Sequence, residues 1–110
     1  MPNGELIVLV TAPKDISESL STTLVSEHLA ACVNIVPGVT SIFFFEGKVC
    51  QEAEVLLLIK TNESAWNQLM NRVKELHTYD IPEIVSLPIA DGFQLYLQWI
   101  NQSCLTKKST

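Results

Sequence analysis

The most reactive side chains in this 110-residue sequence belong to two histidines and three cysteines. Acyl-transfer catalysis needs a nucleophile, a histidine base and an orienting carboxylate within hydrogen-bond reach, and neither histidine belongs to a recognisable set of that kind. The cysteines are odd in number and widely spaced, and no Cys-x-x-Cys pair indicates a zinc or redox site. We therefore expect free thiols and no catalytic residues. The five positions are His28, His77, Cys32, Cys50 and Cys104.

Phosphate chemistry has no more support in the sequence. An acylphosphatase-like enzyme needs an arginine in a loop that cradles the phosphate, but Arg72, the only arginine, lies in a segment with helical periodicity. A nucleotide sensor would need a basic or glycine-rich loop whose backbone amides hold the phosphates, and the sequence has none. We therefore expect that the protein is not an enzyme.

The charge balance argues against two classes of partner. Seven basic residues are scattered among twelve acidic ones, which gives a net charge of -5 and a pI near 4.8. Binding to nucleic acid or to an anionic membrane depends on Lys and Arg, so we expect neither partner.

The longest apolar runs, residues 6–10 and 55–59, are too short to cross a bilayer, and the first residues lack the features of a signal peptide. We expect a soluble, cytoplasmic protein.

Hydrophobic periodicity predicts three helices that position these residues. The first covers residues 14–31, where apolar side chains recur at intervals of three and four. The second is the clearest, because Asn62 and the two residues after it offer helix-capping chemistry and the apolar stripe then runs to His77. The third opens at Asp91 and carries an apolar side made of aromatic and aliphatic residues.

The segments between these helices read as strands. Prolines at positions 82 and 88 cannot donate to a sheet ladder, so the last strand is expected either to lie at an edge of the sheet or to be broken at these positions. The resulting order, βαββαβ with a C-terminal helix, predicts an α+β, ferredoxin-like fold with a four-stranded antiparallel sheet and two helices on one face. We expect one domain over residues 1–110, with a core at about 5–102 and a frayed tail at 103–110. The predicted strands cover residues 6–10, 32–45, 48–60 and 83–90.

The second and third strands should form a long extended hairpin. Each arm has roughly twelve to fourteen residues against a usual five or six, and at about 3.3 Å per residue the hairpin reaches about 40 Å. Pro37-Gly38 should bulge one arm, and Glu46-Gly47 should form the tight turn with a positive φ angle at Gly47. A two-stranded ribbon that ends in three phenylalanines is marginal in water. We therefore expect a neighbouring subunit to cover it.

Several stretches of the sequence resemble the CutA divalent-cation tolerance family. The resemblance covers about residues 6–101, and no single stretch would suffice alone. It implies a compact homotrimer of PII-like architecture that pairs strands across subunits, a role in tolerance of copper and other divalent cations, and no established enzymatic activity. The matching stretches are Val-Leu-Val-Thr-Ala-Pro at 8–13, Leu-Ala-Ala-Cys-Val-Asn at 29–34, Val-Pro-Gly-Val-Thr-Ser at 36–41, Phe-Phe-Glu-Gly-Lys at 44–48, Ile-Lys-Thr at 59–61, His-Thr-Tyr-Asp-Ile-Pro-Glu-Ile at 77–84 and Tyr-Leu-Gln-Trp-Ile at 96–100.

The resemblance also implies copper binding, for which this sequence retains few ligands. Family members can carry a cysteine at the end of the first strand and a His-His pair after the second helix, where this chain has Val10 and Leu76-His77. Copper needs several His, Cys or Met donors. Any site is therefore expected to be weak or assembled between subunits, with His77, Glu83 and Cys32 as candidate metal ligands and Asp80 assisting. Alternatively, His77 satisfies carbonyls at its helix end and Cys32 is a small buried apolar residue.

Four polar and aromatic members of the family pattern are candidates for a cleft between subunits. Glu54 and Lys60 share one face of the third strand, and Tyr79 and Trp99 lie in the later segments. They could hold a small ligand, or they could form an interfacial network that fixes the register of the subunits. Two functions remain open: a metal-tolerance protein, or a PII-like regulatory module that binds an unknown small molecule or protein in its clefts.

Overall fold

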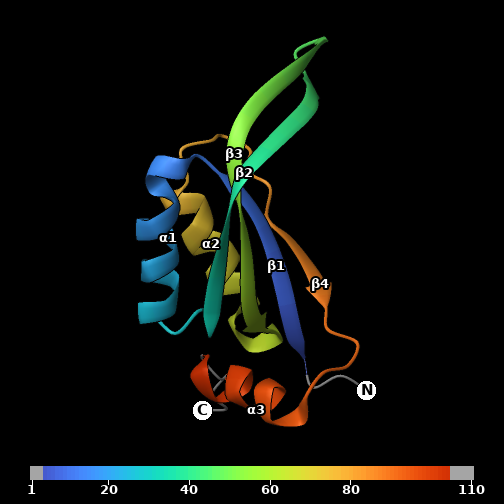
Figure 1. Ribbon diagram of the computed structural model, residues 1–110. Coiled ribbons are helices and arrows are strands. Elements are labelled where there is room, and N and C mark those ends of the chain that lie inside the picture. Colours follow the sequence, from blue (N-terminus) through green and yellow to red (C-terminus); the bar gives the residue numbers. More distant parts are fainter. Residues whose placement is uncertain (1–3, 105–110) are drawn as a thin grey trace.

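The computed structural model describes residues 4–104 and contains a four-stranded antiparallel sheet with three helices (Figure 1). The spatial order of the strands, β2-β3-β1-β4, is that of a ferredoxin-like fold, which confirms the expected topology. None of the helices in this range is long and apolar enough to cross a membrane. The elements are β1 (Glu5–Ala12), α1 (Lys14–Ser26), β2 (Cys32–Phe45), β3 (Lys48–Asn62), α2 (Glu63–Leu76), β4 (Val85–Pro88) and α3 (Gln94–Ser103).

The core lies between one face of the sheet and helices α1 and α2. Side chains of a strand alternate between the two faces, and Val8, Val10, Leu57 and Ile59 all point to the helical side with no exposed surface. Leucines and a valine of the two helices pack against them in one cluster. Each such burial contributes about 1.5–3 kcal/mol, so this layer stabilises the subunit.

The opposite face of the sheet, which we call the open face, has no covering layer within the described chain. Its residues on the two central strands, among them Ile7, Leu9 and Leu58, are half-buried, and Val85 and Leu87 on the edge strand β4 are about half exposed. Helix α3 lies across the end of the sheet (Figure 1), where Ile100 and Leu97 close a second small cluster. The sheet therefore has one buried face and one that is apolar and accessible.

The hairpin of β2 and β3 extends well beyond the sheet as a free ribbon (Figure 1), and the long axis of the molecule is 46 Å against 23 Å for the shortest. The register shifts between Val36 and Val39, so one extra residue sits in β2 at Pro37-Gly38, and Gly38 has a φ of 74°. This is the predicted bulge. At the tip, Glu46 and Gly47 both have positive φ angles, 51° and 79°, which defines a type I′ turn.

Helix α1 is shorter than the periodicity predicts. It ends at Ser26 because His28 adopts a left-handed conformation with a φ of 61°. The amide of Leu29 then donates to the carbonyl of Leu24 (2.9 Å) and that of His28 to Val25 (3.0 Å), the two bonds of a Schellman motif. Leu29 remains in the core, which explains why its hydrophobicity continued the helical pattern beyond the end of the helix.

The last segments also differ in their bounds from the prediction. Strand β4 covers the four residues Val85–Pro88 instead of eight, and it lies at the sheet edge as expected for a strand that contains a proline. Helix α3 begins at Gln94, three residues after Asp91, whose carboxylate accepts the amide of Gly92 (2.8 Å). The frayed tail was predicted for residues 103–110. Its first two residues are ordered differently, since Ser103 ends α3 and Cys104 is buried, and residues 105–110 lie outside the described range.

Candidate functional site

The ribbon and the open face together form an extended accessible apolar surface. Ile42 and Phe44 point to one side of the ribbon, with Val49 directly opposite Phe44, and Phe44 is 73% exposed. Phe43 and Phe45 occupy the other side and are about half exposed. The aromatic residues of the ribbon belong to neither core cluster of the described residues, and an exposed apolar surface of this kind marks a site of protein association.

A chain of hydrogen bonds occupies the place where the ribbon leaves the sheet. The Tyr79 hydroxyl donates to the carboxylate of Glu54 (2.7 Å), and the Tyr79 amide donates to Nδ1 of His77 (3.1 Å). Nε2 of His77 lies 2.8 Å from the carbonyl oxygen of Thr11 on β1. The two rings lie 4.5 Å apart between centroids. Loop, ribbon and central strand are thus joined through three side chains.

This arrangement fixes the state of the His77 ring. A backbone amide can only donate, so Nδ1 carries the lone pair and the proton sits on Nε2, which donates to Thr11. His77 is 8% exposed and ends helix α2 as its C-cap residue. Both ring nitrogens are therefore used within the subunit, and neither is directed at a ligand.

The phenol of Tyr79 is held in its protonated form. Burial, the hydrogen bond to Glu54 and the negative charges of Glu54 and Glu52 raise the pKa of Tyr79 from 10.0 to about 12. Glu54 is 8% exposed, and its carboxylate has no ion-pair partner among residues 4–104. The Tyr79 hydroxyl is thus the donor that satisfies a buried acid.

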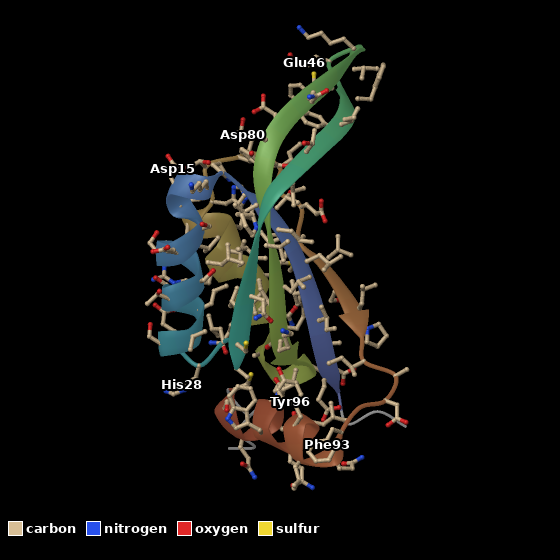
Figure 2. The ribbon with its side chains drawn as sticks, in the orientation of Figure 1. Asp15, His28, Glu46, Asp80, Phe93 and Tyr96 are labelled. Atoms are coloured by element: carbon tan, nitrogen blue, oxygen red, sulfur yellow. The ribbon has the colours of Figure 1, made fainter. Side chains whose placement is uncertain are left out.

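A second polar group lies at the far end of the open face. The ammonium of Lys60 donates to the side-chain oxygen of Asn34, and Cys32 pairs with Lys60 in the ladder. Tyr96 lies near this end (Figure 2), and its pKa is raised by burial and by the nearby Cys32. The ring of Trp99 packs against Tyr96 with centroids 5.5 Å apart. A cation and two aromatic rings therefore flank one end of the sheet.

Within one subunit, the four predicted cleft residues form two separate groups. Glu54 and Tyr79 lie at the base of the ribbon, where Figure 2 shows the adjacent Asp80, whereas Lys60 and Trp99 lie at the end of the sheet near α3. Glu54 and Lys60 are six positions apart on β3, which corresponds to about 20 Å. The two groups can line a single cleft only if another copy brings them together.

The three candidate metal ligands do not form a metal centre within the subunit. Cys32 lies in the same row of the sheet as Lys60 and Ile7, whereas His77 contacts Thr11. The rows of Ile7 and Thr11 are four positions apart on β1, which separates Cys32 from His77 by at least about 13 Å. Glu83 is exposed in the loop before β4. Residues 4–104 contain no group of three or more His, Cys, Asp or Glu side chains that could hold an ion. All three cysteines are free thiols, with Cys32 half-buried.

Two contributors to these groups were not found by sequence reasoning. Thr11 takes part through its backbone carbonyl, which any residue would supply, so no sequence signal marks it. Asn34 could have been found, because it follows Cys32 by two positions on β2. Residues two apart on a strand share a face, and Cys32 pairs with Lys60, so Asn34 must lie on the face of Lys60.

The fold and the uncovered surface define a ferredoxin-like subunit whose sheet and ribbon are suited to association. The family model described as "CutA1 divalent ion tolerance protein" matches residues 6–103. The chain belongs to this family.

Similar proteins have been described in a bacterium and a plant. The divalent-cation tolerance protein CutA of Thermus thermophilus is 49% identical over 100 residues, which cover 90% of this chain and 97% of the relative. Rice protein CutA 1, described as chloroplastic, is 48% identical over 99 residues, and this chain spans 56% of its length. The solved structure of the Thermus thermophilus protein matches with a TM-score of 0.89 at 48% identity, over 91% of this chain and 98% of that one.

Proposed function

We propose that the chain acts as a homotrimer, without enzymatic activity, in the tolerance of divalent cations. Membership of the family and the names of the relatives support the cation role. The observation that carries the assembly is the ribbon with its exposed phenylalanines above an open apolar face. A ribbon that extends from one copy onto the next makes a head-to-tail contact, and such contacts close into a ring when the rotation allows it.

The metal part of the proposal places any cation between copies. The separation of Cys32 from His77 within one subunit means that these side chains could meet only across an interface. A cation at His77 would also have to displace one of its two hydrogen bonds, so we expect weak binding of copper or another divalent ion, with Glu83 as a further ligand. The free thiols favour a reducing compartment, and we therefore propose a cytoplasmic protein.

Two measurements test the proposal. Light scattering on tag-free protein at micromolar concentration should give three times the subunit mass of 12.2 kDa, and a stable folded monomer would overturn the assembly. Calorimetric titration with Cu²⁺ should show saturable binding that His77→Ala weakens. His28→Asn is the matched control, because this second histidine is exposed at the end of α1. If His77→Ala binds copper as the wild type does, His77 is not a ligand.

A second candidate function is a PII-like module that binds a small ligand between copies. Lys60 favours it, because its ammonium has Asn34 as its hydrogen-bond partner and lies at the end of the open face near Tyr96. A ligand with a carboxylate and an apolar body would suit this group. Co-purification of a stoichiometric small molecule that is lost in Lys60→Met would favour this function over cation tolerance.

A further inference from the structure

The hydrogen-bond chain at the base of the ribbon lies where a free ribbon most needs support. Glu54 pairs with Val39, the first residue of β2 after the bulge, so the Tyr79 hydroxyl reaches the first row of the ribbon outside the sheet. Beyond this row the ribbon has two strands and no covering layer within the described chain. A two-stranded ribbon that is joined to its sheet through a bulge can bend at that point.

We propose that His77, Tyr79 and Glu54 form a latch that sets the angle at which the ribbon leaves the sheet, and that His77 serves as a positioning residue in it. His77 holds the loop on β1 through Thr11 and orients Tyr79 through the amide of that residue. Tyr79 then bridges the remaining distance to Glu54 with its long, rigid side chain.

The chemistry of each residue suits this role. Glu54 is a nearly buried acid that needs a donor, and a hydrogen bond to a charged group is stronger than one between neutral groups. The His77 ring accepts at one nitrogen and donates at the other, which lets a single side chain join two backbone segments. Both ring nitrogens of His77 are used in the latch, so a metal ion could bind there only by displacing one of these two hydrogen bonds.

The latch has a consequence for assembly, which rests on the proposed homotrimer. If the ribbon is held at one angle in the free subunit, a neighbouring copy meets a preorganised surface and loses less conformational entropy on binding. Without the latch the same contacts would form only from a fraction of the ribbon orientations. The latch should therefore affect association more than the stability of the core.

Hydrogen exchange of the ribbon amides tests the latch. In Tyr79→Phe the aromatic ring remains but the donor to Glu54 is lost, so the amides of residues 39–53 should exchange about tenfold faster or more, with those of α1 unchanged. The dissociation constant of the assembly should rise about tenfold. Thr23→Val is the matched control, because it also removes one hydroxyl donor (to the carbonyl of Ser19, 2.8 Å), but within α1 and not at the base of the ribbon.

The possible outcomes separate the latch from the proposed function. If the ribbon amides of Tyr79→Phe exchange at rates within twofold of those in the wild type, the latch is overturned. An equal acceleration of amide exchange in α1 would also overturn it, because it would indicate general destabilisation. Nitrogen chemical shifts of His77 should show the proton on Nε2 in the wild type, and a proton on Nδ1 would also overturn the latch. If the wild type is a monomer, the homotrimer fails, but the exchange measurement still tests the latch.

Discussion

Glu46 has a backbone conformation that a glutamate does not favour. Its φ of 51° lies in the left-handed region, and the type I′ turn that it forms with Gly47 prefers Asn or Gly at this position. Glu46→Asn should therefore stabilise the protein by a few tenths to about 1 kcal/mol, because the turn conformation becomes less strained.

Thermal unfolding of Glu46→Asn and the wild type would measure this change. Glu46→Gln is the control, since it removes the charge without favouring the left-handed region. Equal stabilisation by both substitutions would assign the effect to charge and not to the backbone.

The raised pKa of Tyr79 predicts how the stability of the protein depends on pH in the alkaline range. Its pKa is raised from 10.0 to about 12 in the folded protein, chiefly by burial and then by Glu54. A group whose pKa rises on folding stabilises the protein fully below its unfolded pKa. That contribution should be present below pH 10 and be lost as the pH rises from about 10 to 12.

Denaturant unfolding at a series of pH values checks this, with Tyr79→Phe as the comparison. The variant should lose less stability than the wild type across this interval, and a parallel loss in both proteins would contradict the assignment. The chain has two tyrosines, so an ultraviolet titration of Tyr96→Phe reports the pKa of Tyr79 alone.

At the level of elements, a short buried network connects helices α2 and α3. Asn62 caps α2 by accepting the amide of Ala65 (3.0 Å) and donates to the side-chain oxygen of Asn101 on α3 (3.0 Å). Asn101 in turn donates to Glu5 on β1. Asn62→Ala should lower the free energy of unfolding by about 2–3 kcal/mol, because the helix loses its cap and Asn101 loses a buried partner.

Urea unfolding would measure this loss. Asn71→Ala on the exposed side of α2 should change the stability by less than about 0.5 kcal/mol. If Asn62→Ala falls within the same limit, the network contributes little and the docking of α3 rests on its apolar contacts.

The elements show which physical signals a sequence carries. The cap at Asn62, the bulge at Pro37-Gly38 and the turn at Gly47 were predictable, because each depends on a local preference of one or two residues. The end of α1 was not, since the left-handed residue is His28, where glycine is the usual signal, and Leu29 continues the apolar pattern.

At the level of the whole molecule, the sequence predicted the long hairpin of β2 and β3 but not the grouping of the site. The length of the hairpin follows from the number of residues in its two strands. The pairing of Tyr79 with Glu54, and the distance of both from Lys60, depend on how the loop after α2 folds back. Such tertiary contacts leave no periodic signal. The family pattern marks Glu54, Lys60, Tyr79 and Trp99 as candidates for one site, but it does not indicate whether these residues meet within one subunit.

The ribbon makes its sharpest prediction at its exposed tip. Phe44 is 73% exposed and contributes nothing to the two core clusters of the subunit. Phe44→Asp should therefore leave the subunit folded, with unchanged circular dichroism, but should raise the dissociation constant of the assembly at least about a hundredfold, because a charge would be buried at the interface.

Asn67→Asp adds the same charge on the exposed side of α2, away from the ribbon, and should leave the assembly intact. Sedimentation velocity over a range of concentrations distinguishes the two variants. If Phe44→Asp sediments as the wild type does, copies associate without the ribbon tip, and the open face alone would have to carry the contact. Dissociation of both variants would point to net charge instead, since each raises the negative charge of an already acidic chain.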